Sequence, residues 1–88
     1  MELSKFRILL GMAKSMYKLE SENLNHKKAE FWYGFQRGIR RHYHGENFGT
    51  DQQHEKWMNC DDGEYRKQLQ AGYRAGFICD GEVMEVMI

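Results

Sequence analysis

Three histidines and one thiol are the side chains in this sequence best suited to hold a metal ion: His42, His44, His54 and Cys60. Inside a helix, His42 and His44 would point about 200° apart, because they are two positions apart. They could share an ion only if the helix ended before residue 42. His54 and Cys60 are six positions apart, a spacing that matches no standard zinc motif. We therefore expect no metal site.

Covalent and phosphate chemistry find equally little support in the sequence. Cys60 follows His54 by six positions and directly precedes Asp61, but no motif fixes a nucleophile and its base at that spacing. The glycines from Gly34 onward follow no predicted strand, as a phosphate-binding loop requires. A helical domain of 88 residues also has little room to enclose a substrate pocket. We expect a protein that is not an enzyme and uses no cofactor.

The composition indicates one folded domain over residues 1–88. Leu, Ile, Val and Phe are few, but aromatic residues make up 14% of the chain and there are 6 Met, which supply the missing apolar surface. No apolar run approaches the roughly 20 residues of a membrane span, and the N-terminus lacks the pattern of a signal peptide. The two cysteines form no CxxC pair, so we expect reduced thiols in a cytoplasmic protein.

Helical spacing dominates the sequence, which contains no proline. It predicts an all-α fold, a small bundle of three to four helices at about 4–20, 24–44, 51–59 and 62–79. Ser4 is the expected N-cap of the first helix, and Gly45 is expected to end the second in the left-handed region. Thr50 with Gln53 predicts a capping box for the third helix.

The sequence allows more than one conformation for two segments. Residues 21–25 form either a turn or a weak point within one long helix. The tail 82–88 is a short strand, a packed extension or a frayed end.

The apolar stripes of these helices predict which side chains are buried. The first two helices are expected to bury the following residues: Phe6, Leu9, Leu10, Ala13, Met16, Tyr17, Leu24, Lys28 by its methylene stem, Phe31, Trp32, Phe35, Gly38, Ile39 and Tyr43.

Two glycine pairs, Gly34 with Gly38 and Gly72 with Gly76, fall inside predicted helices. Four glycines there cost roughly 4 kcal/mol relative to alanine. Something must offset that cost, and glycines four residues apart form a notch where another backbone can approach. We expect the second and fourth helices to pack closely at these notches. The alternative is that one notch receives a partner.

Charge is unevenly distributed along this chain of zero net charge. Residues 1–49 carry nine basic and five acidic side chains, whereas residues 50–88 carry four and eight. The neutral total argues against a protein that coats nucleic acid by bulk positive charge. The basic end of the second helix and the loop after it, with arginines and aromatics interleaved, are the predicted partner-binding surface. Its residues are Arg37, Arg40, Arg41, Tyr43, His44, Glu46 and Phe48.

The acidic run Asp61, Asp62 and Glu64 is the second candidate surface. Asp62 and Glu64 would also favour the positive end of the fourth helix. Reversing the charges of Arg40 and Arg41 should abolish binding if the basic surface is used. Reversing Asp61, Asp62 and Glu64 should do so if the acidic surface is used.

The segment 32–50, with His54, Trp57 and the later GYRAGF at 72–77, resembles small uncharacterised accessory proteins carried by phages and plasmids. The resemblance covers about half of the chain. It implies a mobile-element context in which short, single-domain proteins bind a host machine. Anti-CRISPR and other anti-defence inhibitors are the best-known group. It assigns no role to any residue.

Three functions follow as hypotheses. The first is a non-enzymatic interaction module, an inhibitor that occludes a host defence or nucleic-acid-handling complex. The second is a small helical protein that binds nucleic acid through the basic end of the second helix. The third is a homo-oligomeric structural protein, a homodimer for example, assembled through the apolar tail Val83–Ile88.

Overall fold

A computed structural model describes residues 2–59 and 64–78, and within these ranges the chain is helical and contains no strand. The elements are α1 (Leu3–Glu22), α2 (His26–His44), the short 3-10 helix η1 (Gly45–Asn47), α3 (Asp51–Asn59) and α4 (Glu64–Ile78). The predicted all-α class is therefore confirmed. The expected tail segment 82–88 and both cysteines lie outside the described residues.

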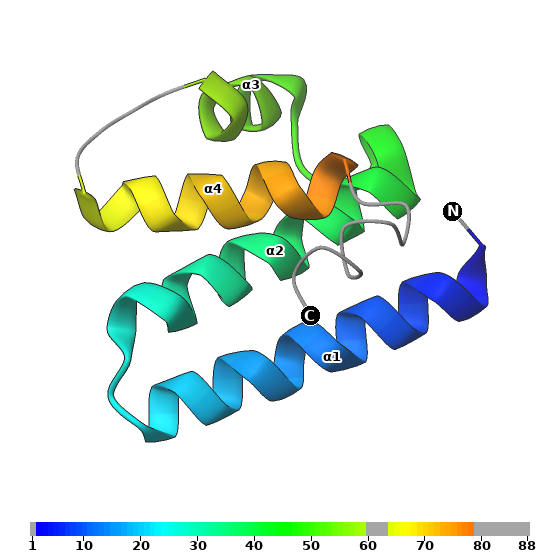
Figure 1. The fold of residues 1–88 in the computed structure, drawn as a ribbon. Helices are drawn as coiled ribbons and strands as arrows, with labels where there is room; N and C mark the ends of the chain where they lie inside the picture. The colour runs from blue at the N-terminus through cyan, green and yellow to red at the C-terminus, as the bar shows by residue number, and fades with distance from the viewer. Residues whose placement is uncertain (1, 60–63, 79–88) are drawn as a thin grey trace.

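The helix α2 is the centre of the arrangement. It packs against α4 along most of its length and against α1 on another side, while α3 lies over α4 (Figure 1). The helices α1 and α2 run antiparallel and are joined by a tight turn. Because α2 contacts both long neighbours, it contributes many of the buried residues of the described chain.

The turn between α1 and α2 settles one alternative left open by the sequence. Leu24 has a φ of 60° and is 74% exposed, so the chain breaks there, and the expectation that Leu24 is buried in a helix is wrong. The Asn25 side-chain amide donates to Glu20 Oε2 at 2.7 Å, and its backbone N–H donates to the Glu20 carbonyl at 2.8 Å. These bonds fix the turn and give the buried Glu20 carboxylate a partner.

The helix ends test three further expectations. The helix α1 already begins at Leu3, so Ser4 lies within it; its hydroxyl bonds to the Glu2 carboxylate instead of capping the helix. The capping box of α3 is confirmed, since Gln53 N–H donates to Thr50 Oγ1 at 3.1 Å and Thr50 N–H donates to Gln53 Oε1 at 3.2 Å. Gly45 ends α2 with φ 60°, but its ψ of −133° places it outside the left-handed helical region.

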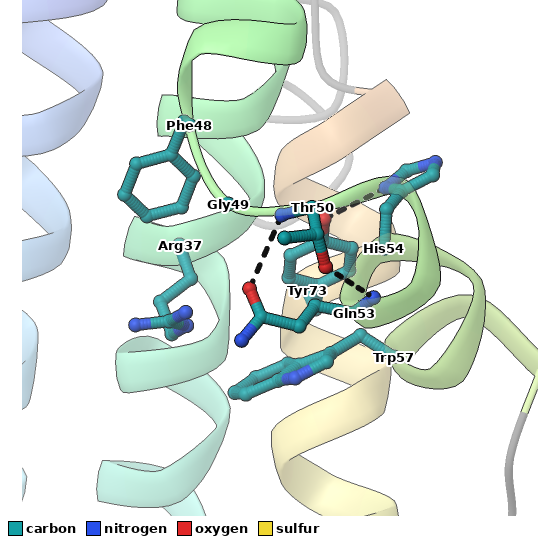
Figure 2. A pocket seen from close by; sticks show the side chains of 8 residues that line it. All are labelled: Arg37, Phe48, Gly49, Thr50, Gln53, His54, Trp57 and Tyr73. Carbon is teal, nitrogen blue, oxygen red and sulfur yellow. Dashed lines mark hydrogen bonds between the residues drawn. The ribbon is translucent and has the colours of Figure 1, made fainter.

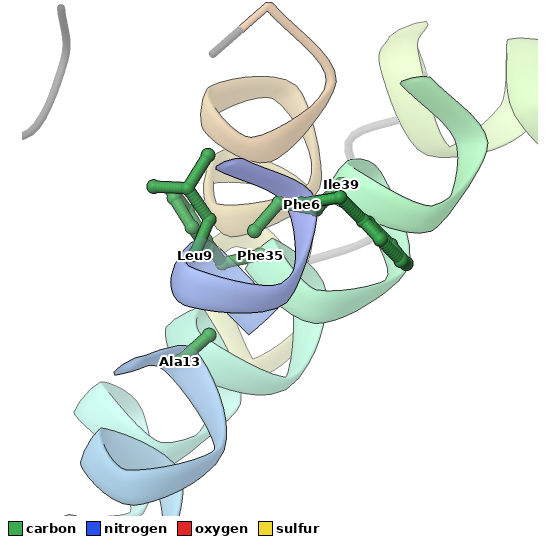
Figure 3. Packing of buried hydrophobic residues seen from close by; sticks show 5 residues of the cluster. All are labelled: Phe6, Leu9, Ala13, Phe35 and Ile39. Atoms are coloured by element: carbon green, nitrogen blue, oxygen red, sulfur yellow. The ribbon is translucent and has the colours of Figure 1, made fainter. Parts of the chain in front are cut away.

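The buried cluster joins one face of α1 to α2 (Figure 3). Besides Leu24, two residues expected to be buried are not: Tyr17 is 39% exposed, and Lys28 is exposed. Tyr17 lies at the margin of the α1 stripe, where the amphipathic pattern cannot decide between a covered and an uncovered ring. The cluster consists of Phe6, Leu9, Ala13, Phe35 and Ile39.

The helices α2 and α4 come very close at glycines. A Cβ added at Gly34 would lie closer than 3.0 Å to the Leu69 carbonyl oxygen, and one at Gly38 would meet the Tyr73 carbonyl oxygen in the same way. From the other side, a Cβ at Gly72 would run into the Phe31 carbonyl oxygen. Backbone atoms cannot move aside as flexible side-chain ends can, so these positions have no room for a methyl group.

Candidate binding site

Arg41, one of the predicted contact residues, lies inside the molecule. It is only 7% exposed; its Nη2 donates to Asp51 Oδ1 at 2.7 Å and its Nη1 to the Phe48 carbonyl at 3.1 Å. Arg41 therefore ties α2 to the loop and to the start of α3. A partner cannot reach it, and reversing its charge would test the stability of the fold rather than binding.

Tyr43 also serves the interior. Its ring stacks on Phe6 with centroids 4.3 Å apart and an interplanar angle of 10°, which fastens α1 to the end of α2. His44 and Glu46 are exposed and Arg40 is half-buried, so these three predicted residues remain at the surface. Asp61 and Asp62 lie outside the described residues, as does the side chain of Glu64, the first residue of α4.

His42 and His44, two of the candidate metal ligands, contact different helices, and Cys60 lies outside the described residues. The His42 ring bonds through Nδ1 to the Phe77 carbonyl in α4, whereas the His44 ring lies edge-on to Phe6 in α1. Among residues 2–59 and 64–78, no three His, Cys, Asp or Glu side chains come together in a way that could hold an ion.

Arg37 is the predicted residue with the most unusual surroundings. Its guanidinium carbon lies 5.3 Å from the centre of the Phe48 ring and 4.9 Å from the centre of the Trp57 ring (Figure 2). Its Nε is buried and has no hydrogen-bond partner among the described residues. An unsatisfied buried donor costs about 1–3 kcal/mol. We call Arg37 with these two rings the Arg37 clamp.

A small cavity of about 10 Å³ adjoins the Arg37 clamp, enough room for a single water molecule. Thr50 and Gln53 of the α3 capping box form one wall. His54 and Tyr73 form another, and His54 Nδ1 lies 2.7 Å from the Tyr73 hydroxyl in a hydrogen bond. The cavity is lined by Arg37, Phe48, Gly49, Thr50, Gln53, His54, Trp57 and Tyr73.

The electrostatics of this cavity are set by Arg37. Burial, followed by the positive charge of Arg41, lowers the pKa of His54 below its usual 6.5, against the opposing effect of Asp51 and Glu55. Burial likewise raises the pKa of Tyr73 above its usual 10.0. Both groups are therefore uncharged at neutral pH, and Arg37 carries the one formal charge among the lining residues.

The sequence pointed to Arg37 and Phe48 but not to the rest of this site. The contact of Trp57 with Arg37 spans 20 positions that no local pattern links. The sequence signal that helps to locate Trp57 is the capping box. It fixes where α3 starts, and Trp57 then lies two turns later, on the same side of the helix as Thr50.

Comparisons of the chain with protein-family models, curated proteins and solved structures find no match. None of the helices in the described ranges is long and apolar enough to cross a membrane.

Proposed function

We propose that this protein is a non-catalytic interaction module whose Arg37 clamp receives a carboxylate from an acidic segment of a partner protein. The observation that carries the proposal is the Arg37 guanidinium beside two aromatic rings, with a buried Nε that has no hydrogen-bond partner among residues 2–59 and 64–78. A guanidinium offers a planar fork of donors that matches a carboxylate. Arginine and tryptophan are also the residues that most often dominate protein interfaces.

Pre-organisation favours this use of Arg37. A free arginine loses side-chain entropy when it binds, but the rings of Phe48 and Trp57 already restrict this one. Phe48 and Trp57 are in turn positioned by the Arg41 bonds and by the capping box.

The biological setting is part of the proposal and depends on the resemblance to phage and plasmid accessory proteins. In that setting the module is an inhibitor that occludes a host defence or nucleic-acid-handling complex. Its mechanism is steric cover together with charge pairing at Arg37. The alternative of assembly through Val83–Ile88 concerns residues outside the described ranges.

The test measures binding of a fluorescein-labelled, glutamate-rich peptide by anisotropy. Arg37→Lys keeps the charge but loses the fork, so we expect its affinity to fall about tenfold. The matched control is Arg74→Lys, an exposed arginine whose Nε already donates to the Met58 carbonyl at 2.5 Å. The control should bind within twofold of the wild type.

Two results would refute the proposal. One is equal loss of affinity in both variants, which would reduce the effect to general electrostatics. The other is displacement of the peptide by inorganic phosphate at concentrations where acetate has no effect, which would assign phosphate rather than carboxylate to the clamp.

A further inference from the structure

Two surface stripes with the same spacing run along α1 and α2. In α1, Arg7 is followed by basic residues 7 and 11 positions later, and all three side chains are exposed. In α2, Tyr33, Arg40 and His44 repeat that spacing. Steps of seven and four residues return to the same side of a helix, so each set lies on one face. The α1 stripe consists of Arg7, Lys14 and Lys18.

The two stripes border one seam. The rings of Tyr17 and Tyr33 lie 6.0 Å apart at an angle of 48°, and Phe6 contacts His44 at 5.4 Å near the other end. Lys14 lies about one turn from Tyr17, so the basic stripe of α1 runs beside the tyrosine pair. The resulting surface, called the basic tyrosine face, consists of Arg7, Lys14, Tyr17, Lys18, Tyr33, Arg40 and His44.

This face concentrates positive charge in a protein of zero net charge. No acidic residue occurs between Arg7 and Lys18 or between Tyr33 and His44. At a rise of 1.5 Å per residue, the three cations of α1 extend over about 16 Å. The two tyrosines stay 39% and 43% exposed despite their mutual contact, so part of each ring is open to a ligand.

We propose that the basic tyrosine face binds single-stranded nucleic acid. Proteins that bind single strands without sequence preference combine cations that follow the phosphate backbone with aromatic rings on which bases stack. Unpaired bases can reach rings on a helix seam, whereas bases stacked in a duplex cannot. The Arg37 clamp takes no part in this proposal, because its guanidinium lies between Phe48 and Trp57.

The first test is a salt titration with an oligo-dT of about twelve nucleotides, a length within the site sizes of single-strand binders. Each phosphate neutralised on a single strand contributes about 0.7 to the slope of log affinity against log salt. Lys14→Glu with Lys18→Glu should weaken binding at least tenfold at low salt and reduce the slope by about 1.4 or more. Lys56→Glu with Lys67→Glu makes the same charge change on exposed positions of α3 and α4 and should bind nearly as the wild type does.

The second test separates stacking from charge. Tyr17→Leu and Tyr33→Leu keep an apolar side chain but remove the ring, and each should weaken oligo-dT binding about tenfold at unchanged salt slope. Circular dichroism confirms that the variants keep their helices. Oligo-U in place of oligo-dT tells whether the sugar matters and should bind comparably.

The proposal is overturned if a blunt duplex of equal length binds as tightly as the single strand. It is also overturned if both double-lysine variants lose affinity equally, or if the labelled acidic peptide loses its affinity in the Lys14/Lys18 variant while oligo-dT does not.

Discussion

Arg37 and Arg41 are four residues apart on one helix, and their surroundings give them opposite roles. Arg41 uses its donors within the protein, on Asp51 and on the Phe48 carbonyl. Arg37 lies beside two aromatic rings, which attract the cation but accept no hydrogen bond from its Nε–H. Arg41 therefore stabilises the loop, while Arg37 keeps a buried Nε–H that no described residue uses.

The role of Arg41 predicts an asymmetric loss of stability. Arg41→Gln should lower the free energy of unfolding by about 1.5–3 kcal/mol, because it removes charge-assisted bonds to a buried side chain. Asp51→Asn should cost less than about 1 kcal/mol. The Asp51 side chain is 80% exposed, so water screens the charge that the substitution removes. Urea denaturation measures both. An equal cost for the two variants would contradict this account.

His54 predicts how stability depends on pH. Its pKa is lowered in the folded protein, so below pH 6.5 the unfolded chain binds the proton more readily. The contribution of His54 is therefore fully present above pH 6.5 and is lost as the pH falls below that value. Urea midpoints at pH 7.5 and 5.5 should differ less in His54→Gln than in the wild type. His26→Gln, at an exposed position, should leave the difference unchanged.

At the scale of the elements, the molecule depends on how closely α2 and α4 approach. Glycine inside a helix is unfavourable by about 1 kcal/mol, yet α2 and α4 each place two where the backbones meet. Gly11 in α1 differs, because a Cβ there would meet nothing within 4 Å. Glycine is therefore required where α2 and α4 meet, whereas at Gly11 it only lowers the stability of α1.

This contrast makes a direct prediction. Gly38→Ala should destabilise the fold by about 2 kcal/mol or more, because the helices must separate to admit the methyl group. Gly11→Ala should stabilise it by about 0.5–1 kcal/mol through helix propensity alone. Thermal unfolding of the two variants, which carry the same chemical change, measures the difference. A stabilised Gly38→Ala variant would disprove the close approach.

The elements could be predicted from the sequence where local chemistry decides them. The Thr50–Gln53 box and the four helices follow from capping residues and helical spacing. Ser4 and Leu24 were misjudged because a helix start and a turn also depend on neighbours such as Glu2 and Glu20. The surroundings of Arg37 and Arg41 depend on the chain turning back after α2 so that α3 lies over α4, and no pairwise spacing in the sequence encodes that arrangement.

At the scale of the whole molecule, a chain of zero net charge carries the two surfaces proposed above, which differ in their chemistry. The Arg37 clamp offers one oriented donor group beneath α3, and the basic tyrosine face offers several cations along α1 and α2. The two proposals stand or fall separately. If both hold, the protein can contact an acidic protein segment and a nucleic-acid strand at once, as an occluding inhibitor of a nucleic-acid-handling complex would.

The most direct test of the central claim is an NMR titration of the 15N-labelled protein with the glutamate-rich peptide. The Arg37 Nε–H and Trp57 indole N–H signals should shift together and saturate. The Arg74 Nε–H and Trp32 indole signals should stay in place. An unmoved Arg37 signal while the peptide binds would contradict the account, because the carboxylate would then be held elsewhere.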